Sequence, residues 1–277
     1  EMKRIREMFP LHKFERVSRY LEELRLRKEE WEIALIRRAS EITVAGMKRI
    51  ARKCRPGIPE KILEAEFVYE CMTNNAQQAY APIIASGINA CTLHYSKNSS
   101  ICQEGSLLLV DAGAEYGNYA SDCTRTFPVN GRFTRRQKEV YLSVVRIFEE
   151  CIERIVPGKS IEQVEQDIRP IIEEEHLKLG LYTKNDLTSE NPDEPLFRKY
   201  TIHGISHFLG LDVHDPGEKM LLLEPGMVLT CEPGIYIPKE NIGIENTLLI
   251  TQKGNQVLTD SLPVLPDEIE SMVSTKE

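Results

Sequence analysis

The string HGISHFLGLDVHD at residues 203–215 contains three of the chain's six histidines. Its apolar residues alternate as in a strand, which places His203 and His207 on one face, whereas His214 needs a bend near Gly210 to reach the same site. A lone histidine among apolar residues is usually a hydrogen-bonded core residue. Three within so short a stretch favour a metal-binding or catalytic site, because imidazole is a metal ligand and exchanges protons near neutral pH.

Four carboxylates stand in matched positions on two pairs of strand-like runs. A hairpin whose two-residue turn is Tyr116-Gly117 sets Asp111 directly opposite Asp122. Glu232 and Glu245 bracket a second turn in a similar way. Like charges on buried strands repel one another, and a bound cation turns that repulsion into attraction. The carboxylates therefore predict a cation site.

These four carboxylates and His207 are too many ligands for one small divalent ion, but they suit two ions with bridging carboxylates. A set of hard oxygen ligands with a single nitrogen favours manganese, cobalt, iron or zinc. Two such ions about 3.5 to 4 Å apart can hold a shared water as hydroxide and polarise a carbonyl group. The residue types therefore indicate hydrolytic chemistry. Cys123 and Cys231 adjoin two of the acids, but strand alternation turns both thiols into the core.

The segments that would position these residues occur twice in the same order. Helical periodicity over residues 21–55 ends at Pro56-Gly57, and a second helix follows with Pro59 in its first turn. Two further helical segments, separated by Pro157-Gly158, repeat the arrangement, and each pair of helices precedes two strand-like runs. The repetition predicts an internal duplication with two αβ halves that face one another.

Composition narrows the class of protein. The 277 residues are 41% hydrophobic and 28% charged, which is typical of a globular protein, and the net charge of -8 argues against nucleic-acid or anionic-membrane partners. No run of apolar residues is close to the length of about 20 residues that a helix needs to span a bilayer. Seven cysteines without a CxxC pair indicate neither a disulfide framework nor a zinc ribbon. A reducing, cytoplasmic location is expected.

The ordered motifs VDAGAEYGNYASDCTRTFPVNGRFTRRQKEVY, HGISHFLGLDVHD, LEPGMVLTCEPGIYI and GIENTLLIT resemble those of the pita-bread metallopeptidases, in particular the Xaa-Pro aminopeptidases. The resemblance runs from about Leu24 to Leu262. It implies an α+β pita-bread fold, in which internally duplicated αβ halves surround a curved, mainly antiparallel sheet. We expect residues 24–277 to form the catalytic domain, and residues 1–23 to be a helical lead-in segment, the remnant of a linker from an absent N-terminal domain.

The resemblance also implies a role for each candidate ligand. Asp111 would bind one ion, Asp122 and Glu245 would bridge two ions, and His207 and Glu232 would complete the second site. Manganese is the metal expected from the family, with cobalt, zinc and iron as alternatives. Glu232 would in addition carry the proton of the attacking water, which a carboxylate at the edge of a metal site can accept and pass on.

Three histidines are implied as substrate contacts by the same resemblance. His94, in NACTLHY, matches a histidine near the scissile bond, while His203 and His214 match residues that bind substrate and stabilise or shuttle protons at the tetrahedral intermediate. One position departs from the family pattern. Gly243 stands where relatives commonly carry arginine, on the face predicted for Glu245, so that a cationic substrate contact is missing.

The function expected is hydrolysis of the N-terminal Xaa-Pro bond of peptides that have proline at the second position. A homo-oligomer is compatible with this family, and neither nucleic acid nor a membrane is an expected partner. Two alternatives remain open at this point: an Xaa-Pro dipeptidase (prolidase), which shares the ligands, and a pita-bread module that binds peptides without cleaving them. All five ligands are present, which favours an enzyme over the binding module.

Overall fold

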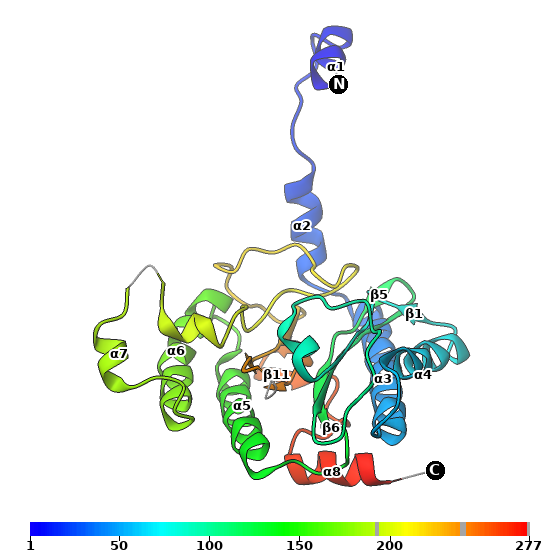
Figure 1. Cartoon of the computed structure of the whole chain (residues 1–277). Coiled ribbons are helices and arrows are strands. Elements are labelled where there is room, and N and C mark those ends of the chain that lie inside the picture. Colours follow the sequence, from blue (N-terminus) through cyan, green and yellow to red (C-terminus); the bar gives the residue numbers. More distant parts are fainter. Residues whose placement is uncertain (192–193, 239–241, 276–277) are drawn as a thin grey trace.

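The computed structural model describes residues 1–191, 194–238 and 242–275, and Figure 1 shows their arrangement. The helices are α1 (Met2–Met8), α2 (Ser18–Leu26), α3 (Glu30–Lys53), α4 (Glu60–Thr73), α5 (Arg135–Arg154), α6 (Ile161–Lys178), α7 (Lys184–Thr188) and α8 (Pro266–Ser274), with 3-10 turns η1 (Gly87–Cys91) and η2 (Leu196–Lys199). The strands are β1 (Gln77–Gln78), β2 (Ile83–Ser86), β3 (Leu107–Asp111), β4 (Ala114–Tyr116), β5 (Tyr119–Ala120), β6 (Thr124–Pro128), β7 (Val228–Cys231), β8 (Gly234–Ile235), β9 (Ile242–Gly243), β10 (Asn246–Thr251) and β11 (Gly254–Val257).

The two halves of the chain have the same order of elements. Helices α3 and α4 precede the sheet of β2, β3 and β6, and helices α5 and α6 precede the sheet of β7, β10 and β11. Pairings between strands in the described part of the chain are all antiparallel. Figure 1 shows α3 and α4 on one side of the strands and α5 and α6 on the other. The predicted α+β pita-bread fold with duplicated halves is confirmed.

The halves join where β6 lies beside β9 and the start of β10. The amide of Glu245 donates to the carbonyl of Thr124 over 3.0 Å, and the amide of Gly243 donates to the Thr126 hydroxyl over 3.0 Å. One large hydrophobic core runs through both halves, from Met47 in α3 to Val144 in α5 and Leu229 in β7. Residues near this seam are therefore held by contacts from both halves.

The helix predicted over residues 21–55 is two helices. Helix α2 ends at Leu26, α3 begins at Glu30, and the junction between them is extended. Arg27 bridges Met227 in an antiparallel pair, and the Lys28 amide donates to the carbonyl of Gly226 over 2.8 Å. These pairings hold the junction in an extended conformation against the second half of the chain. Helical periodicity alone therefore did not determine the backbone conformation there. In Figure 1, α1 and α2 project from the body.

The turn of the first hairpin lies one residue later than predicted. Tyr116 pairs with Tyr119, and the turn consists of Gly117 and Asn118, whose φ angles are 58° and 69°. Hairpin turns of this two-residue kind require positive φ at both positions, which glycine and asparagine adopt readily and tyrosine does not. The prediction of a Tyr116-Gly117 turn is wrong for this reason.

The corrected turn changes the register of the strands behind it. Asp111 faces Thr124 rather than Asp122, which is two residues away along the partner strand. Residues two positions apart on a strand share a face, so Asp111 and Asp122 remain diagonal neighbours on the same side.

No helix in the described residues is long and apolar enough to cross a membrane.

Candidate metal centre

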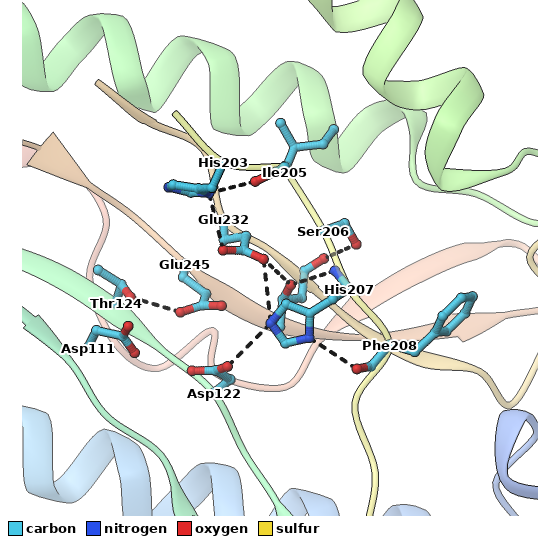
Figure 2. A network of polar contacts seen from close by, with 12 residues as sticks. Asp111, Asp122, Thr124, His203, Ile205, Ser206, His207, Phe208, Glu232 and Glu245 are labelled. Atoms are coloured by element: carbon cyan, nitrogen blue, oxygen red, sulfur yellow. Dashed lines mark hydrogen bonds and ion pairs between the residues drawn. The ribbon is translucent and has the colours of Figure 1, made fainter. Parts of the chain in front are cut away.

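Five side chains from five separate segments line one cavity of about 480 Å³. They are the candidate ligands Asp111 at the end of β3, Asp122 between β5 and β6, His207 in the loop before β7, Glu232 after β7 and Glu245 before β10. In Figure 2 the imidazole of His207 and the carboxylates of Asp122, Glu232 and Glu245 point toward one another. The five residues predicted from the sequence therefore come together.

The spacing of these groups suits a small ion. His207 Nε2 lies 3.6 Å from an oxygen of Asp122 and 3.5 Å from an oxygen of Glu232. Ligand atoms of Asp122, His207 and Glu245 all lie within 4.8 Å of one another. A single ion between them would reach all three.

Neighbouring hydroxyl groups orient the ligands. The Thr124 hydroxyl donates to one oxygen of Glu245 over 2.8 Å. The Thr230 hydroxyl donates to Glu232 over 3.1 Å and accepts from the amide of His207 over 3.1 Å. Such contacts fix the orientation of a ligand before an ion arrives, which is common around metal sites.

The site carries more negative charge than its surroundings balance. Burial, followed by repulsion from Asp122, raises the pKa of both Asp111 and Glu245 well above ordinary values. Burial also raises the pKa of Glu232. Among the described residues that line the cavity, the one lysine or arginine is Lys219, which is already 2.7 Å from Glu165. Divalent cations would relieve this repulsion, so the residues present fit a metal centre.

His207 responds to the same charges in the opposite direction. Burial opposes its charged form, yet its hydrogen bond with Asp122 and the charge of Glu232 raise its pKa to about 9. A proton on His207 thus partly compensates the carboxylates when no other cation is near. A metal ion would replace that proton, because only neutral imidazole coordinates.

Three further histidines line the same cavity as the candidate ligands. His203 Nδ1 lies 3.5 Å from Glu232, and its Nε2 is 2.8 Å from the hydroxyl of Tyr236. The ring of His214 is nearly perpendicular to that of His207, with centroids 4.4 Å apart. His94 lines the same cavity and has a φ of 55°.

The segment that carries three of these histidines is not the predicted strand. Residues 203–215 form an irregular loop in which Phe208 alone makes a bridge, to Leu229 in β7. The loop backbone is held instead by hydrogen bonds such as that from the Asp215 amide to the Phe208 carbonyl, 2.9 Å. The loop turns back after Gly210, where the bend was expected, and so brings His214 to His207.

Gly243 lines the cavity together with Glu245, as alternation predicted. A Cβ atom at this position would lie 3.2 Å from side-chain atoms of both Leu109 and Thr124. Cys123 and Cys231 are fully buried, which confirms them as core residues.

Sequence reasoning missed two tyrosines and an arginine. The Tyr80 hydroxyl is hydrogen-bonded to both Asp111 and Asp122, but Tyr80 lies in a loop that no motif marks. Tyr236 reaches His203 from the segment directly after Glu232. Arg125 is fully buried and donates to the Glu245 carbonyl over 2.7 Å. Its place inside a predicted buried strand was a usable signal, since an unpaired buried guanidinium would be very costly.

Comparisons with known proteins identify the family to which the chain belongs. The family model of "Metallopeptidase family M24" matches residues 34–252. The Xaa-Pro aminopeptidase of Escherichia coli is 42% identical over 268 residues, which cover 91% of this chain and 60% of that protein. Human Xaa-Pro aminopeptidase 3 is 35% identical, with 93% of this chain and 53% of that protein covered.

Solved structures show the same similarity. A variant of Escherichia coli aminopeptidase P in complex with substrate has a TM-score of 0.88 and 40% identity, over 93% of this chain and 61% of that one. Zinc-substituted Escherichia coli aminopeptidase P in complex with product has a TM-score of 0.86 and 42% identity, over 92% and 61% of the two chains. The chain spans between 53% and 61% of the length of these relatives. It belongs to metallopeptidase family M24.

Proposed function

We propose that this chain is the catalytic part of a metal-dependent aminopeptidase that removes the first residue of peptides with proline at the second position. The observation that carries the proposal is the convergence of four carboxylates and His207 on one cavity, with three further histidines around them. Similarity to the Xaa-Pro aminopeptidases supports the choice of substrate.

We assign two divalent ions to the five candidate ligands. Asp111 would hold one ion, His207 and Glu232 would hold the other, and Asp122 and Glu245 would be ligands shared by both. Manganese is the proposed metal, with cobalt, zinc and iron as alternatives that the same oxygen-rich set accepts. When bound, such a pair lowers the pKa of a shared water and polarises the carbonyl group of the scissile bond.

The protein's own groups then handle protons and substrate. Glu232 accepts the proton of the attacking water and passes it to the nitrogen of the departing proline, as a carboxylate at the edge of a metal site can do. His203 lies 3.5 Å from Glu232 and can hydrogen-bond the substrate beside it. His214 and His94 line the same cavity and complete the substrate contacts.

The wider setting of the site is also a proposal. Residues 24–277 form the catalytic domain, and residues 1–23 form a helical lead-in whose α1 has no buried residue within its described span. Seven free cysteines favour a cytoplasmic location. A homo-oligomer is compatible with the family, and the net charge of -8 opposes a nucleic-acid partner.

Kinetics on three peptides after manganese loading test this function. An Xaa-Pro dipeptide, an Xaa-Pro-Yaa tripeptide and a longer peptide with proline second are compared with a matched tripeptide that has alanine second. Hydrolysis of the tripeptide and the longer peptide is expected. Cleavage of the dipeptide alone would instead identify an Xaa-Pro dipeptidase, and no cleavage with any divalent ion would identify a peptide-binding module.

A further inference from the structure

A buried ion-pair cluster lies behind the loop that carries His214. The carboxylate of Asp215 is inaccessible to solvent, and Lys28 Nζ, in a side chain only 2% exposed, lies 3.1 Å from it. Arg25 forms an ion pair with the other oxygen of Asp215. It forms a second ion pair, of 2.6 Å, with Asp212. We call Arg25, Lys28 and Asp215 the Asp215 clamp.

Two glycines make room for this clamp. A Cβ atom on Gly210 would lie 2.6 Å from an oxygen of Asp215 and 2.8 Å from Cε of Lys28. A Cβ atom on Gly226, whose φ is 90°, would lie 3.1 Å from the carbonyl oxygen of Lys28. A side chain at Gly210 would crowd the ion pair, and one at Gly226 would crowd the backbone of the junction between α2 and α3. The two glycines therefore allow the junction and the segments beside it to approach one another closely.

The Asp215 carboxylate also shapes the loop itself. One of its oxygens accepts from the Asp212 amide over 3.3 Å, and the Asp212 carbonyl accepts from the Gly210 amide over 3.0 Å. His214 precedes Asp215 in the chain, and its ring stands 4.4 Å from that of His207. The clamp is therefore one peptide bond away from a histidine that faces the candidate metal centre.

Stability alone is a poor reason for such a cluster. Taking charges out of water is costly, and apolar residues of similar size often stabilise a fold equally well. Burial lowers the pKa of Lys28, which reflects that cost. A buried pair with specific geometry is better suited to fixing the position of the segment that carries it.

We propose that Arg25 and Lys28 are positioning residues for catalysis, which act through Asp215 to hold His214 against the metal centre. The inference rests on the proposed aminopeptidase function. Arg25 and Lys28 lie outside residues 34–252, which match the family model, so the catalytic unit extends into the junction before α3.

The test compares Lys28→Met and Arg25→Gln with Arg27→Gln as a matched control. Arg27 belongs to the same junction, but its partner Glu224, at 2.6 Å, is on the surface, and the two side chains are 55% and 50% exposed. Both clamp variants should lower kcat for an Xaa-Pro-Yaa peptide by about 10- to 100-fold, with a smaller change in KM and unchanged metal content. The control should keep the wild-type kcat.

Combination with His214→Ala separates positioning from general damage. If the clamp acts through His214, Lys28→Met has little further effect on kcat once His214 is alanine, because coupled residues are not additive. An equal fold-loss in both backgrounds, or an unchanged kcat in both clamp variants, overturns the proposal. Arg25 is partly exposed, so Arg25→Gln decides the matter if Lys28→Met does not fold.

A second readout does not depend on peptidase activity. Hydrogen exchange of residues 207–215 in the metal-free protein should become faster in Lys28→Met and Arg25→Gln and stay unchanged in Arg27→Gln. Unchanged exchange in the clamp variants contradicts the inference. A wild-type chain that cleaves no Xaa-Pro peptide, yet shows the faster exchange in its clamp variants, would refute the proposed function and leave the anchoring of the loop intact.

Discussion

Asp122 and Glu245 come from opposite halves of the duplicated fold, yet atoms of both carboxylates lie within 4.8 Å of each other and of His207. The side chain of Thr247 links the two segments, because its Oγ1 accepts from the amide of Asp122 over 3.1 Å and donates to the carbonyl of Asp122 over 2.8 Å. Neither half holds this set alone. The candidate site therefore depends on the seam where the two halves join.

Replacing the proposed bridging ligand should empty the site. Asp122→Ala removes a carboxylate assigned to both ions, so we expect loss of bound metal and of all turnover. Metal content after dialysis, with Asp260→Ala as an exposed control, measures this. Wild-type metal content in Asp122→Ala would contradict the assignment of the bridge.

The metal-free protein should lose stability as the pH rises. The pKa values of Asp111 and Glu245 are raised above ordinary values of 3.8 and 4.5, so the folded state binds more protons than the unfolded state above those values. His207, with a pKa raised from 6.5 to about 9, stabilises the fold below 6.5, and this contribution is lost as the pH passes 9. The two carboxyl groups thus lower the free energy of unfolding as the pH rises above 3.8 and 4.5, and His207 lowers it further between pH 6.5 and about 9.

Thermal unfolding of the metal-free chain across this pH range checks the expectation. Glu245→Gln removes one of the raised carboxyl groups and should flatten the decline. Saturation with manganese should raise the melting temperature most at the alkaline end, where the ligands have lost their protons. A melting temperature that rises steadily with pH in the absence of metal would be the opposite of this outcome.

Thr124 should matter for metal affinity although it is not a ligand. Its hydroxyl donates to Glu245 over 2.8 Å and so fixes the orientation of this carboxylate. Thr124→Val keeps the shape and removes this bond, so we expect metal affinity to fall by about 10- to 100-fold. Calorimetric titration measures the change, with Thr251→Val as a control away from the site. An affinity equal to that of the wild type would mean that Glu245 needs no such partner.

His214 should affect the reaction and not the metal. His214→Ala leaves the five candidate ligands in place, so metal content should stay the same. Turnover of an Xaa-Pro-Yaa peptide should slow by about 10²- to 10⁴-fold, the usual contribution of a positioned proton-transfer group. Unchanged turnover would show that His214 has only a structural role.

Residue types and spacing were sufficient to find the candidate ligands, because buried carboxylates in matched positions repel one another unless cations lie between them. They were insufficient for the register of the first hairpin, where the positive φ of Gly117 and Asn118 decided the turn. They also failed at residues 27–29, which tertiary pairing with Gly226 and Met227 holds extended.

Contacts between distant segments account for the features that the sequence did not reveal. Lys28 and Asp215 are 187 residues apart, and no local pattern marks them as partners. Tyr80 meets Asp122 from 42 residues away, out of a loop that lacks periodicity. Such contacts arise when the two halves and their loops pack together, and short-range patterns in the sequence carry no information about them.

The stoichiometry of metal binding tests the central claim most directly. A calorimetric titration of Mn²⁺ into the metal-free chain should show two ions bound per chain in the wild type. The same titration on Glu245→Ala should show that binding of both ions is weakened, because this carboxylate is assigned to both. Binding of no ion by the wild type, or two ions bound by Glu245→Ala with unchanged affinity, would contradict the proposed centre.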